Sequence, residues 1–476
     1  MMKRLTFRLT VMLMIGCNSS SAYTLHENIS TTVFWAGEKG SEANHNIPNI
    51  ASAWDDMWMM HYNGIDNPDH REGWHPAGFT PKENPFYFAL PFNDFDENGE
   101  KKANLTDYIP WATSSDANNT SICKNRWIKI TKGTETAYAQ WEDVGPFGED
   151  DKAYVFGTSQ PQNTVNDNAG LDVSPAVRDY LSLNDIDKTD WQFVDEEDVP
   201  NGPWKEIITT GNVKWVEWYR PKVDTTWQWQ LQGDINTSYN VEVYDIDLFD
   251  TNTSVIASLH QKGKKVICYF SAGSWEDWRD DKDDFPSSVI GNDMDGWEGE
   301  KWLDISNEAL HPIMEARLDL AVQKGCDGVE PDNVDGYTNN TGFDLNASDQ
   351  LEYNKFIATQ AHERGLSVGL KNDLDQVATL EPFFDFSVNE QCHVYSECDK
   401  LQPFIDANKP VFNAEYAQKY VDNTNGQRDE LCAQSNNMKM KTLVLPLDLD
   451  DSFRYSCFDN EHRWGQFCNA LFYLIN

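Results

Sequence analysis

The feature that most constrains the fold is a series of eight short apolar runs in the C-terminal half, separated by longer segments of helical period. The runs are 227–231, 241–246, 265–270, 328–330, 366–370, 385–389, 410–413 and 442–446. Short strand-like runs that alternate with helical segments are typical of βα units, whose strands lie parallel in one sheet. Eight such units in about 250 residues predict an α/β fold, a (β/α)8 barrel of the TIM type, over residues 225–476.

One connecting segment shows the helical period clearly. Between Ser306 and Gly325, apolar residues recur at the spacing of one helical face, and the segment ends at a glycine, as helices commonly do. We expect an amphipathic helix here that packs on the barrel. Its core-facing residues would be Leu310, Ile313, Met314, Leu318 and Ala321.

The N-terminal half has a different pattern. Aromatic and β-branched runs such as 126–131 and 136–141 are broken by clusters of Gly, Pro, Asn and Asp, which is typical of strands joined by turns. We therefore expect the barrel to be preceded by a mostly-β domain over residues 23–210.

Acidic side chains gather just after the predicted barrel strands, where the active sites of such barrels are built. A single acid in such a place more often caps a helix or forms an ion pair, but a group at consecutive strand ends favours catalysis. Glycoside hydrolases need one carboxyl to protonate the leaving oxygen and another to attack the sugar or to activate water. On this pattern alone, Glu330, Asp332 and Asp335 are rival candidates for the first of these acids.

Four segments, 268–273, 325–337, 365–372 and 388–392, resemble glycoside hydrolase family 114, the endo-α-1,4-polygalactosaminidases. The resemblance covers roughly residues 225–475 and implies cleavage of internal bonds in a polymer of α-1,4-linked galactosamine. It implies Asp332 in Glu-Pro-Asp-Asn-Val-Asp as the nucleophile and Glu390 in Val-Asn-Glu-Gln-Cys as the acid/base residue. We expect this hydrolysis to need no metal ion and no cofactor.

Other polar and aromatic residues at the strand ends are candidate contacts with the amine and hydroxyl groups of the sugar. Lys371 has an alternative role, in which it orients a carboxylate through an ion pair. The candidate substrate-binding residues are Trp229, Asp245, Asp247, Tyr269, Asp335, Lys371, Asn372, Glu415 and Asp448.

The charge of the chain limits its partners. Lys and Arg total 38 against 78 Asp and Glu, a formal net charge of −40, which repels phosphate backbones and makes nucleic acid an unlikely partner. A solvated acidic surface is one explanation of this charge, and attraction of a cationic or partly deacetylated polysaccharide is another. Neither CxxC nor HExxH occurs, so we expect no zinc site.

Two segments of the N-terminal half, 140–147 and 170–176, resemble the double-psi β-barrel of the rare lipoprotein A and expansin type. One interpretation of this half is a glycan-binding groove with Asp94, Asp143 and Asp172 as candidate contacts. Alternatively, Asp143 shapes its turn and Asp172 caps the helix that begins near Pro175. We expect three tryptophans to lie in the core rather than to bind sugar, namely Trp141, Trp191 and Trp204.

The first 22 residues have the order of a secretory signal, with basic residues, an apolar run and then small residues. Residues 14–17 resemble a bacterial lipoprotein cleavage box, so a lipid anchor at Cys17 and plain secretion are alternatives, and we expect a secreted or cell-envelope protein. No run approaches 18 apolar residues, so we expect no transmembrane span. The other eight cysteines predict disulfides, with Cys392–Cys398 and Cys432–Cys457 as the expected pairs.

Two other functions remain open from the sequence. The chain could be a non-catalytic, lectin-like protein that binds cell-surface polysaccharide, although retention of both Asp332 and Glu390 disfavours this. Alternatively, the N-terminal domain cleaves peptidoglycan and the barrel is secondary.

Overall fold

The computed structural model describes residues 23–458 apart from 42–43, 45, 117–118, 212–215 and 217. The chain divides into two compact units between residues 214 and 215, inside the interval left between the two expected domains. The expected signal segment, Cys17 and Cys468 lie outside the described residues. Within the described part, no helix has the length and apolar character needed to cross a membrane.

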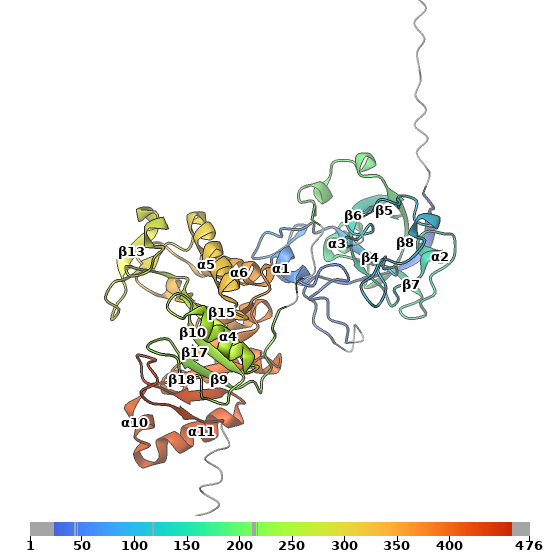
Figure 1. Ribbon diagram of the computed structural model, residues 1–476. Coiled ribbons are helices and arrows are strands. Elements are labelled where there is room, and N and C mark those ends of the chain that lie inside the picture. Colours follow the sequence, from blue (N-terminus) through green and yellow to red (C-terminus); the bar gives the residue numbers. More distant parts are fainter. Residues whose placement is uncertain are drawn as a thin grey trace, which may run out of the picture. The chain divides into compact units, whose positions relative to one another are not determined.

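The N-terminal unit is a closed barrel of six strands in the order β1-β7-β4-β6-β5-β8 (Figure 1). The pairs β1–β7 and β4–β6 are parallel, and the other neighbours are antiparallel. This confirms the expected mostly-β domain. The strands are β1 (His26–Val33), β4 (Tyr87–Leu90), β5 (Trp127–Lys132), β6 (Glu135–Val144), β7 (Ala169–Val173) and β8 (Ile186–Val194).

Short elements surround this barrel, and aromatic side chains fill it. Trp141, Trp191 and Trp204 are buried in its core, as expected. The short elements are α1 (Trp58–Tyr62), β2 (Arg71–Glu72), β3 (His75–Pro76), η1 (Leu105–Asp107), α2 (Lys152–Val155), α3 (Pro175–Leu181), η2 (Glu196–Asp198) and η3 (Pro203–Lys205).

The alternative role given to Asp172 as a helix cap is wrong. The N-cap of α3 is Ser174, whose side chain accepts a hydrogen bond from the backbone N–H of Val177 at 3.3 Å. Asp172 lies inside β7, two residues before the cap, and its carboxylate accepts a hydrogen bond from the hydroxyl of Thr32 instead.

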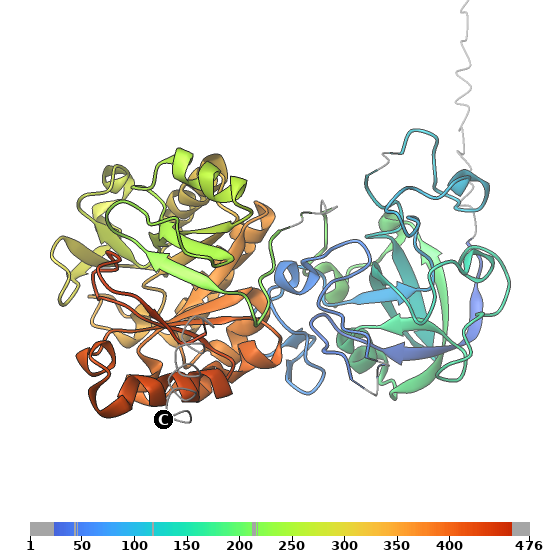
Figure 2. The same cartoon turned by 60° about the horizontal axis from the view of Figure 1, so that its bottom comes forward.

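The C-terminal unit is built on eight parallel strands, each of which coincides with one of the predicted apolar runs. They are β9 (Trp227–Gln230), β10 (Val243–Asp247), β11 (Lys265–Ser271), β15 (Gly328–Asp332), β16 (Ser367–Lys371), β17 (Phe386–Glu390), β18 (Val411–Glu415) and β19 (Lys441–Val444). Each strand pairs with the next in this order, and β20 (Tyr455–Ser456) adds an antiparallel partner to β19. In Figure 2 these strands run from green β9 to red β19.

The first and last barrel strands meet without a backbone ladder among the described residues. The indole N–H of Trp227 donates to the backbone carbonyl of Lys441 at 2.7 Å, and the N–H of Leu231 donates to the carbonyl of Leu449 at 3.0 Å. The Trp227 ring also stacks on Phe412 with its centroid 4.8 Å away. The Trp227 side chain and a backbone contact beyond the strand ends therefore close the barrel at this seam.

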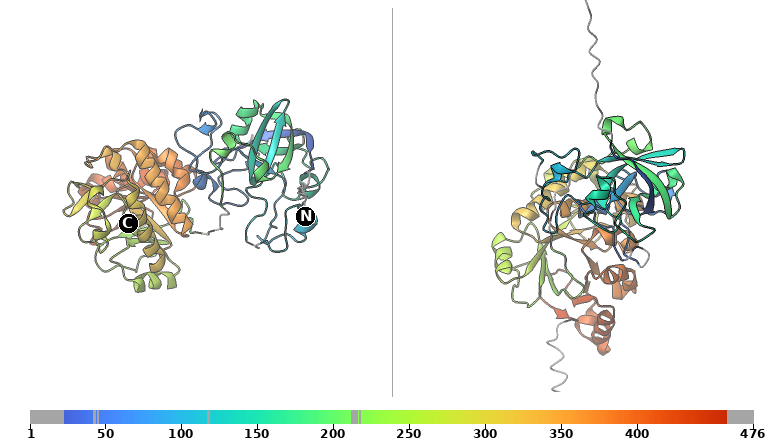
Figure 3. Two further views of the ribbon diagram at one scale, coloured as in Figure 1. Left: turned by 90° about the horizontal axis from the view of Figure 1, so that it is seen from above. Right: turned by 90° about the vertical axis from the view of Figure 1, so that its right-hand side faces the viewer.

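Helices connect most of the strands, and the helix expected between 306 and 325 is confirmed. It forms α5 and ends at Gly325 in the left-handed region with φ 88°, and all five of the expected core residues are buried. Figure 3 shows α5 and α6 side by side. The helices are α4 (Thr253–Gln261), α5 (His311–Lys324), α6 (Ala347–Glu363), α7 (Val377–Leu380), α8 (Cys392–Tyr395), α9 (Gln402–Asp406), α10 (Gln418–Val421) and α11 (Gln427–Asn437).

The strict alternation of strand and helix fails at two connections. A loop without a helix joins β9 to β10, and a small sheet precedes α5 between β11 and β15, made of β12 (Ser274–Glu276), β13 (Ile290–Asp293) and β14 (Glu300–Leu303). The short 3-10 helices of this unit are η4 (Lys282–Asp284), η5 (Ser287–Val289), η6 (Glu308–Leu310), η7 (Gly336–Thr338), η8 (Glu381–Phe383), η9 (Cys398–Leu401) and η10 (Thr424–Gly426).

The described residues contain three disulfides, all in the C-terminal unit. The two expected pairs, Cys392–Cys398 and Cys432–Cys457, are confirmed. The third, Cys268–Cys326, ties β11 to the segment just before β15 and was not predicted. The remaining described cysteine, Cys123, is a buried thiol of the N-terminal unit.

Candidate active site

Three adjacent strands of the C-terminal barrel each end with a charged residue. β15 ends at Asp332, β16 at Lys371 and β17 at Glu390. The residue after each strand turns the chain through the left-handed region, at φ 61° for Asn333, 50° for Asn372 and 62° for Gln391. Asparagine adopts this region more readily than most residues, so the local sequence favours two of these turns.

The ammonium group of Lys371 lies at the centre of the site, where its side chain is only 2% exposed. Its Nζ atom is 3.0 Å from Asp332 Oδ1, 3.3 Å from Glu390 Oε2 and 3.4 Å from Glu330 Oε1. Burial opposes the charge of this amine, but the three carboxylates hold its pKa well above the ordinary lysine value. Lys371 is therefore a cation that joins the strand ends, the alternative role expected for it.

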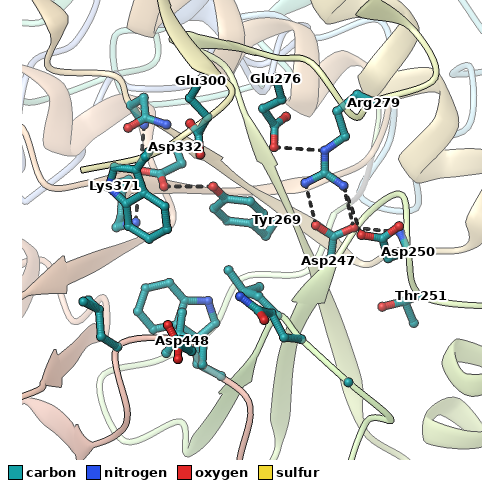
Figure 4. A pocket seen from close by; sticks show the side chains of 18 of the residues that line it. Asp247, Asp250, Thr251, Tyr269, Glu276, Arg279, Glu300, Asp332, Lys371 and Asp448 are labelled. Atoms are coloured by element: carbon teal, nitrogen blue, oxygen red, sulfur yellow. Dashed lines mark hydrogen bonds and ion pairs between the residues drawn. The ribbon is translucent and has the colours of Figure 1, made fainter. Parts of the chain in front are cut away.

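Hydrogen bonds fix the carboxylate of Asp332. Its Oδ1 atom accepts the backbone N–H of Asn333 at 2.6 Å, and its Oδ2 atom accepts the hydroxyl of Tyr269 at 3.1 Å (Figure 4). The side chain is 17% exposed, so a ligand can reach it.

A separate set of groups fixes Glu390. Its Oε1 atom accepts the hydroxyl of Tyr416 at 2.6 Å, and Asn372 donates to Oε2 at 3.4 Å. The Asn372 side-chain oxygen in turn accepts the backbone N–H of Glu390 at 3.0 Å. With 28% of its side chain exposed, Glu390 is the more open of the two acids.

Two further acids, Asp245 and Glu330, are fully buried in the same cluster. Burial raises the pKa of Asp245 to about 7 and that of Glu330 well above its usual range; the interaction between the two carboxyls raises the pKa of Glu330 further and lowers that of Asp245. Two such carboxyls beside one ammonium hold protons more tightly than exposed acids do. Glu330 was a rival for the first catalytic acid, but its full burial removes it from contact with a polymer.

The two exposed acids line a cavity of about 710 Å³. A second hollow of about 340 Å³ shares Asp335, Asn372 and Glu390 with this cavity but does not include Asp332 among its lining residues. The two hollows therefore meet at Glu390. Among the residues that line the larger cavity, Trp278 and Trp297 have exposed rings, about half of their surface being accessible.

An ion-pair network forms another part of the cavity wall (Figure 4). Arg279 donates to Asp247 Oδ2 at 2.8 Å and to Glu276 at 2.9 Å. Nearby, burial raises the pKa of Glu300 to about 7. The carboxylate of Asp247, expected to contact sugar, is therefore already engaged by a guanidinium.

The structure brings most of the predicted substrate-binding residues to this cavity. The lining includes Trp229, Asp247, Tyr269, Asp335, Lys371, Asn372 and Asp448. Burial raises the pKa of Asp335 to about 6, and the charge of Asp332 adds to the shift. Asp245 lies beneath the cavity and does not line it.

The expectation that Glu415 contacts sugar does not fit its position. Glu415 is fully buried outside the linings of both hollows, and its carboxylate accepts the backbone N–H of His393 at 2.9 Å. The next residue, Tyr416, is the one that reaches the site. Side chains alternate between the two sides of a strand, so neighbouring residues point in opposite directions. The acid at position 415 therefore points away from the site, and the tyrosine at position 416 points into it.

Other residues of the cavity wall escaped sequence reasoning because they lie in the connection between β11 and β15. Glu276, Arg279 and Glu300 belong to the small sheet or its loops, which follow no barrel period. Their only sequence signal was the run of acidic and tryptophan residues between 275 and 302.

In the N-terminal unit, Asp94 does not fit the expectation of a glycan contact. It is fully buried, where its carboxylate pairs with Lys101 and accepts hydrogen bonds from the hydroxyl of Ser121 and the N–H of Ile122. A carboxylate with all of these partners stabilises its loop.

Asp143 and Asp172 differ from Asp94. Burial raises the pKa of each to about 7, and the charge of Asp172 adds to the shift at Asp143. Asp143 also accepts the backbone N–H groups of Ala53 and Val144, at 2.7 and 2.8 Å, so it shapes the turn as the alternative reading expected.

One group among the described residues has the spacing of metal ligands, namely Cys392, His393 and Cys398. Its two cysteines are joined in a disulfide, so they offer no thiolate to a metal ion.

The fold and the site together define a class of protein. A parallel eight-stranded barrel with two exposed carboxylates at its strand ends, beside an open cavity, is the arrangement of a glycoside hydrolase. The model of glycoside-hydrolase family GH114 matches residues 208–469, more than half of the chain. The chain belongs to glycoside hydrolase family GH114.

Solved structures of similar proteins include Ega3 from Aspergillus fumigatus, a complex with galactosamine. It is 44% identical over 52% of this chain and 100% of its own, with a TM-score of 0.49. The glycoside hydrolase domain of PelA from Pseudomonas aeruginosa is 12% identical over 50% of this chain and 99% of its own, with a TM-score of 0.39. No curated protein matches the chain.

Proposed function

We propose that this protein is an exported endo-hydrolase that cleaves α-1,4 linkages inside galactosamine-containing polysaccharide. The observation that carries the proposal is that one ammonium group, Lys371, contacts both Asp332 and Glu390 at the junction of two hollows. The 44% identical protein is a complex with galactosamine, which makes this aminosugar the one to test. The net charge of −40 suits a polymer whose free amines are cationic.

We assign the nucleophile to Asp332 and the acid/base role to Glu390. Glu390 gives its proton to the glycosidic oxygen while the bond from that oxygen to the anomeric carbon breaks and an Asp332 oxygen bonds to this carbon. A water molecule then attacks the same carbon, Glu390 takes its proton, and the bond to Asp332 breaks. Lys371 and Tyr269 hold the Asp332 carboxylate in position for the attack.

The geometry supports retention of configuration. Retaining glycosidases hold their carboxyl groups about 5–5.5 Å apart and inverting enzymes about 6.5–9.5 Å. Asp332 Oδ1 and Glu390 Oε2 lie 3.0 and 3.3 Å from the same Nζ atom, so their separation cannot exceed the sum of these distances. That sum lies below the inverting range. We therefore expect the α-anomer to appear first when the products are followed by NMR.

The two hollows support cleavage inside a chain rather than at its end. One lies on the Asp332 side and contains the exposed rings of Trp278 and Trp297, and the other extends beyond Glu390. Sugar units on both sides of the broken bond therefore have space.

We infer that the N-terminal unit is a double-psi β-barrel that binds glycan and positions the hydrolase. The closed six-stranded barrel with two parallel strand pairs supports this fold, and Asp172 is the proposed contact. The rival function, peptidoglycan cleavage, is tested with the full chain carrying Asp332→Asn, which disables the barrel. Turnover of isolated peptidoglycan by this variant would favour the rival, whereas binding without turnover favours a positioning role.

We propose that the chain is secreted or held at the cell envelope. The signal-like first 22 residues and the three disulfides suit an oxidising compartment. Palmitate labelling of the parent and of Cys17→Ser distinguishes a lipid anchor from plain secretion.

The function is tested by incubating the protein with α-1,4-linked galactosamine polymer, deacetylated or N-acetylated, and resolving the products by mass. We expect shorter oligomers from the parent and none from Asp332→Asn or Glu390→Gln. Matched controls are Asp319→Asn and Glu315→Gln on α5, which remove the ion pairs that these two residues form with Arg364 at the end of α6.

Failure of the parent to cleave either polymer would overturn the proposed activity. If binding of the polymer persisted in that case, the non-catalytic, lectin-like function would replace it. Cleavage by both acid variants at the parental rate would instead refute the assignment of Asp332 and Glu390.

A further inference from the structure

The second hollow carries features that the reaction at Asp332 and Glu390 does not use. It is lined by the turns after β15 and β16 and by the loop after β17 that the Cys392–Cys398 disulfide closes. Its lining residues are Asp335, Tyr337, Thr338, Asn372, Asp373, Leu374, Asp375, Asn389, Glu390, Gln391, Tyr395, Glu397 and Lys400.

Asp373 is a buried residue of this hollow, and one of its carboxylate oxygens has no hydrogen-bond partner. It is 3% exposed, its Oδ2 atom accepts the side chain of Asn354 at 2.9 Å, and its Oδ1 atom has no hydrogen-bond partner. The residue has a left-handed backbone with φ 46°, directly after Asn372 in the same region.

Tyr395 presents an aromatic face at the mouth of the hollow. Its side chain is 64% exposed at the end of α8, although most aromatic rings of the described residues are buried. The disulfide between Cys392 and Cys398 joins residues that lie six apart in the sequence, on either side of Tyr395, and so restricts the backbone that carries the ring. Exposed rings on restrained loops are suitable surfaces for the apolar face of a sugar.

The charges around the hollow favour a cation. Acidic groups from four segments face it, namely Asp335, Asp373, Asp375, Glu390 and Glu397. The one basic residue in its lining, Lys400, already pairs with Asp375 at 2.7 Å and Glu397 at 4.0 Å. Glu390 contacts Lys371, so Asp335 and Asp373 are the acids of the lining that have no basic partner among the described residues, and an entering ammonium group can pair with them.

We propose that this hollow binds the aminosugar unit on the leaving-group side of the cleaved bond, with Asp373 pairing with its ammonium group and Tyr395 stacking on its ring. The inference rests on the proposed function, because the side is set by Glu390. The acid that protonates the leaving oxygen must lie beside the leaving sugar, and this hollow contains Glu390 but not Asp332.

The ionisation of Asp373 agrees with this role. Burial, together with the charge of Asp335, raises the pKa of Asp373 to about 8, so its carboxyl is largely protonated when the hollow is empty. An ammonium group placed beside Oδ1 stabilises the ionised form, and the neutral acetamide of an N-acetylated unit does not. Asp373 would thus distinguish free amines from acetylated ones.

The test compares kcat/KM of the full chain and of Asp373→Asn on deacetylated and N-acetylated polymer. The amide can still accept the hydrogen bond from Asn354, so we expect the fold to persist, as judged by an unchanged melting temperature. We expect a loss of about tenfold or more on the deacetylated polymer, from the loss of a charged hydrogen bond, and a change below twofold on the acetylated one. Asp406→Asn on α9, outside both hollows, is the matched control.

Tyr395 supplies the second arm of the test. Tyr395→Ala should lower kcat/KM about fivefold on both polymers, whereas Tyr395→Phe keeps the ring and should keep the rate. If the parent cleaves the polymer but Asp373→Asn and Tyr395→Ala both retain its kinetics, the inference is overturned and the proposed function stands. If the parent cleaves neither polymer, the proposed function fails and the assignment of a leaving-group side fails with it.

Discussion

Replacing Lys371 with methionine tests the central feature of the site. The substitution keeps most of the side-chain volume and removes the ammonium that lies 3.0–3.4 Å from three carboxylates. At such distances, each attraction is worth about 5 kcal/mol at an effective dielectric constant of 20, before the cost of burying the charge. Because Lys371 is almost fully buried, we expect its loss to lower the free energy of unfolding by about 3–5 kcal/mol.

The effect should depend on pH in a definite direction. Without the cation, the carboxylates around position 371 are destabilised in their ionised forms and regain stability when they bind protons. The loss of stability should therefore be larger at pH 8 than at pH 5. The acidic limb of the pH–rate profile should move to higher pH, and kcat should fall about 10²–10³-fold, as when one preorganised charge-stabilising group is removed.

The assays are kcat/KM on the galactosamine polymer across pH 4 to 9 and urea unfolding at pH 5 and 8. Lys355→Met is the matched control, because Lys355 is also a buried lysine of the C-terminal unit but lies outside the linings of both hollows. A Lys371→Met variant with a parental rate and an unmoved acidic limb would refute the idea that this ammonium organises the acids.

Three further outcomes follow from the structure. The pKa of Asp245 is raised to about 7 in the folded state, so the parent loses stability as pH rises from about 4 through 7. Asp245→Asn should therefore have a higher melting temperature than the parent at pH 8 but not at pH 4, and calorimetry at both pH values checks the sign. A Cβ atom on Gly273 would lie 1.7 Å from the carbonyl oxygen of Asn333, so Gly273→Ala should displace the turn after β15 and lower kcat about 10²-fold. Gly336→Ala is the control and should not lower kcat, because a Cβ atom there would lie 3.5 Å from its nearest neighbour. Asp94→Ala should destabilise the N-terminal unit by about 3–5 kcal/mol in urea unfolding and leave polymer cleavage unchanged, and a loss of glycan binding without a loss of stability would restore Asp94 as a contact.

The period of apolar residues was sufficient to locate the eight barrel strands, because buried parallel strands are continuous apolar runs. It also placed Asp332, Lys371 and Glu390 together, since the carboxyl ends of neighbouring parallel strands lie at one edge. The seam between β9 and β19 was beyond prediction, because it depends on the ring of Trp227 rather than on a strand pattern.

What failed had a common physical cause, the direction in which a side chain points. Glu415 and Tyr416 are adjacent at one strand end, and only the observed alternation shows that the acid is internal. Asp247 was located correctly, but its partner Arg279 comes from an irregular connection that no periodicity describes. Asp94 likewise has its partners in loops distant in sequence.

The left-handed residues that follow Asp332, Lys371 and Glu390 have a consequence for how such an enzyme can change. Each turn sets the angle at which the chain leaves the barrel, so the reacting groups are oriented before the longer loops begin. Loops grafted downstream of Asn333, Asn372 and Gln391 can then alter which polymer is accepted without moving the acids. The turns thus separate the residues that carry out the reaction from the loops that contact the polymer, and they mark the positions at which a foreign loop can be joined.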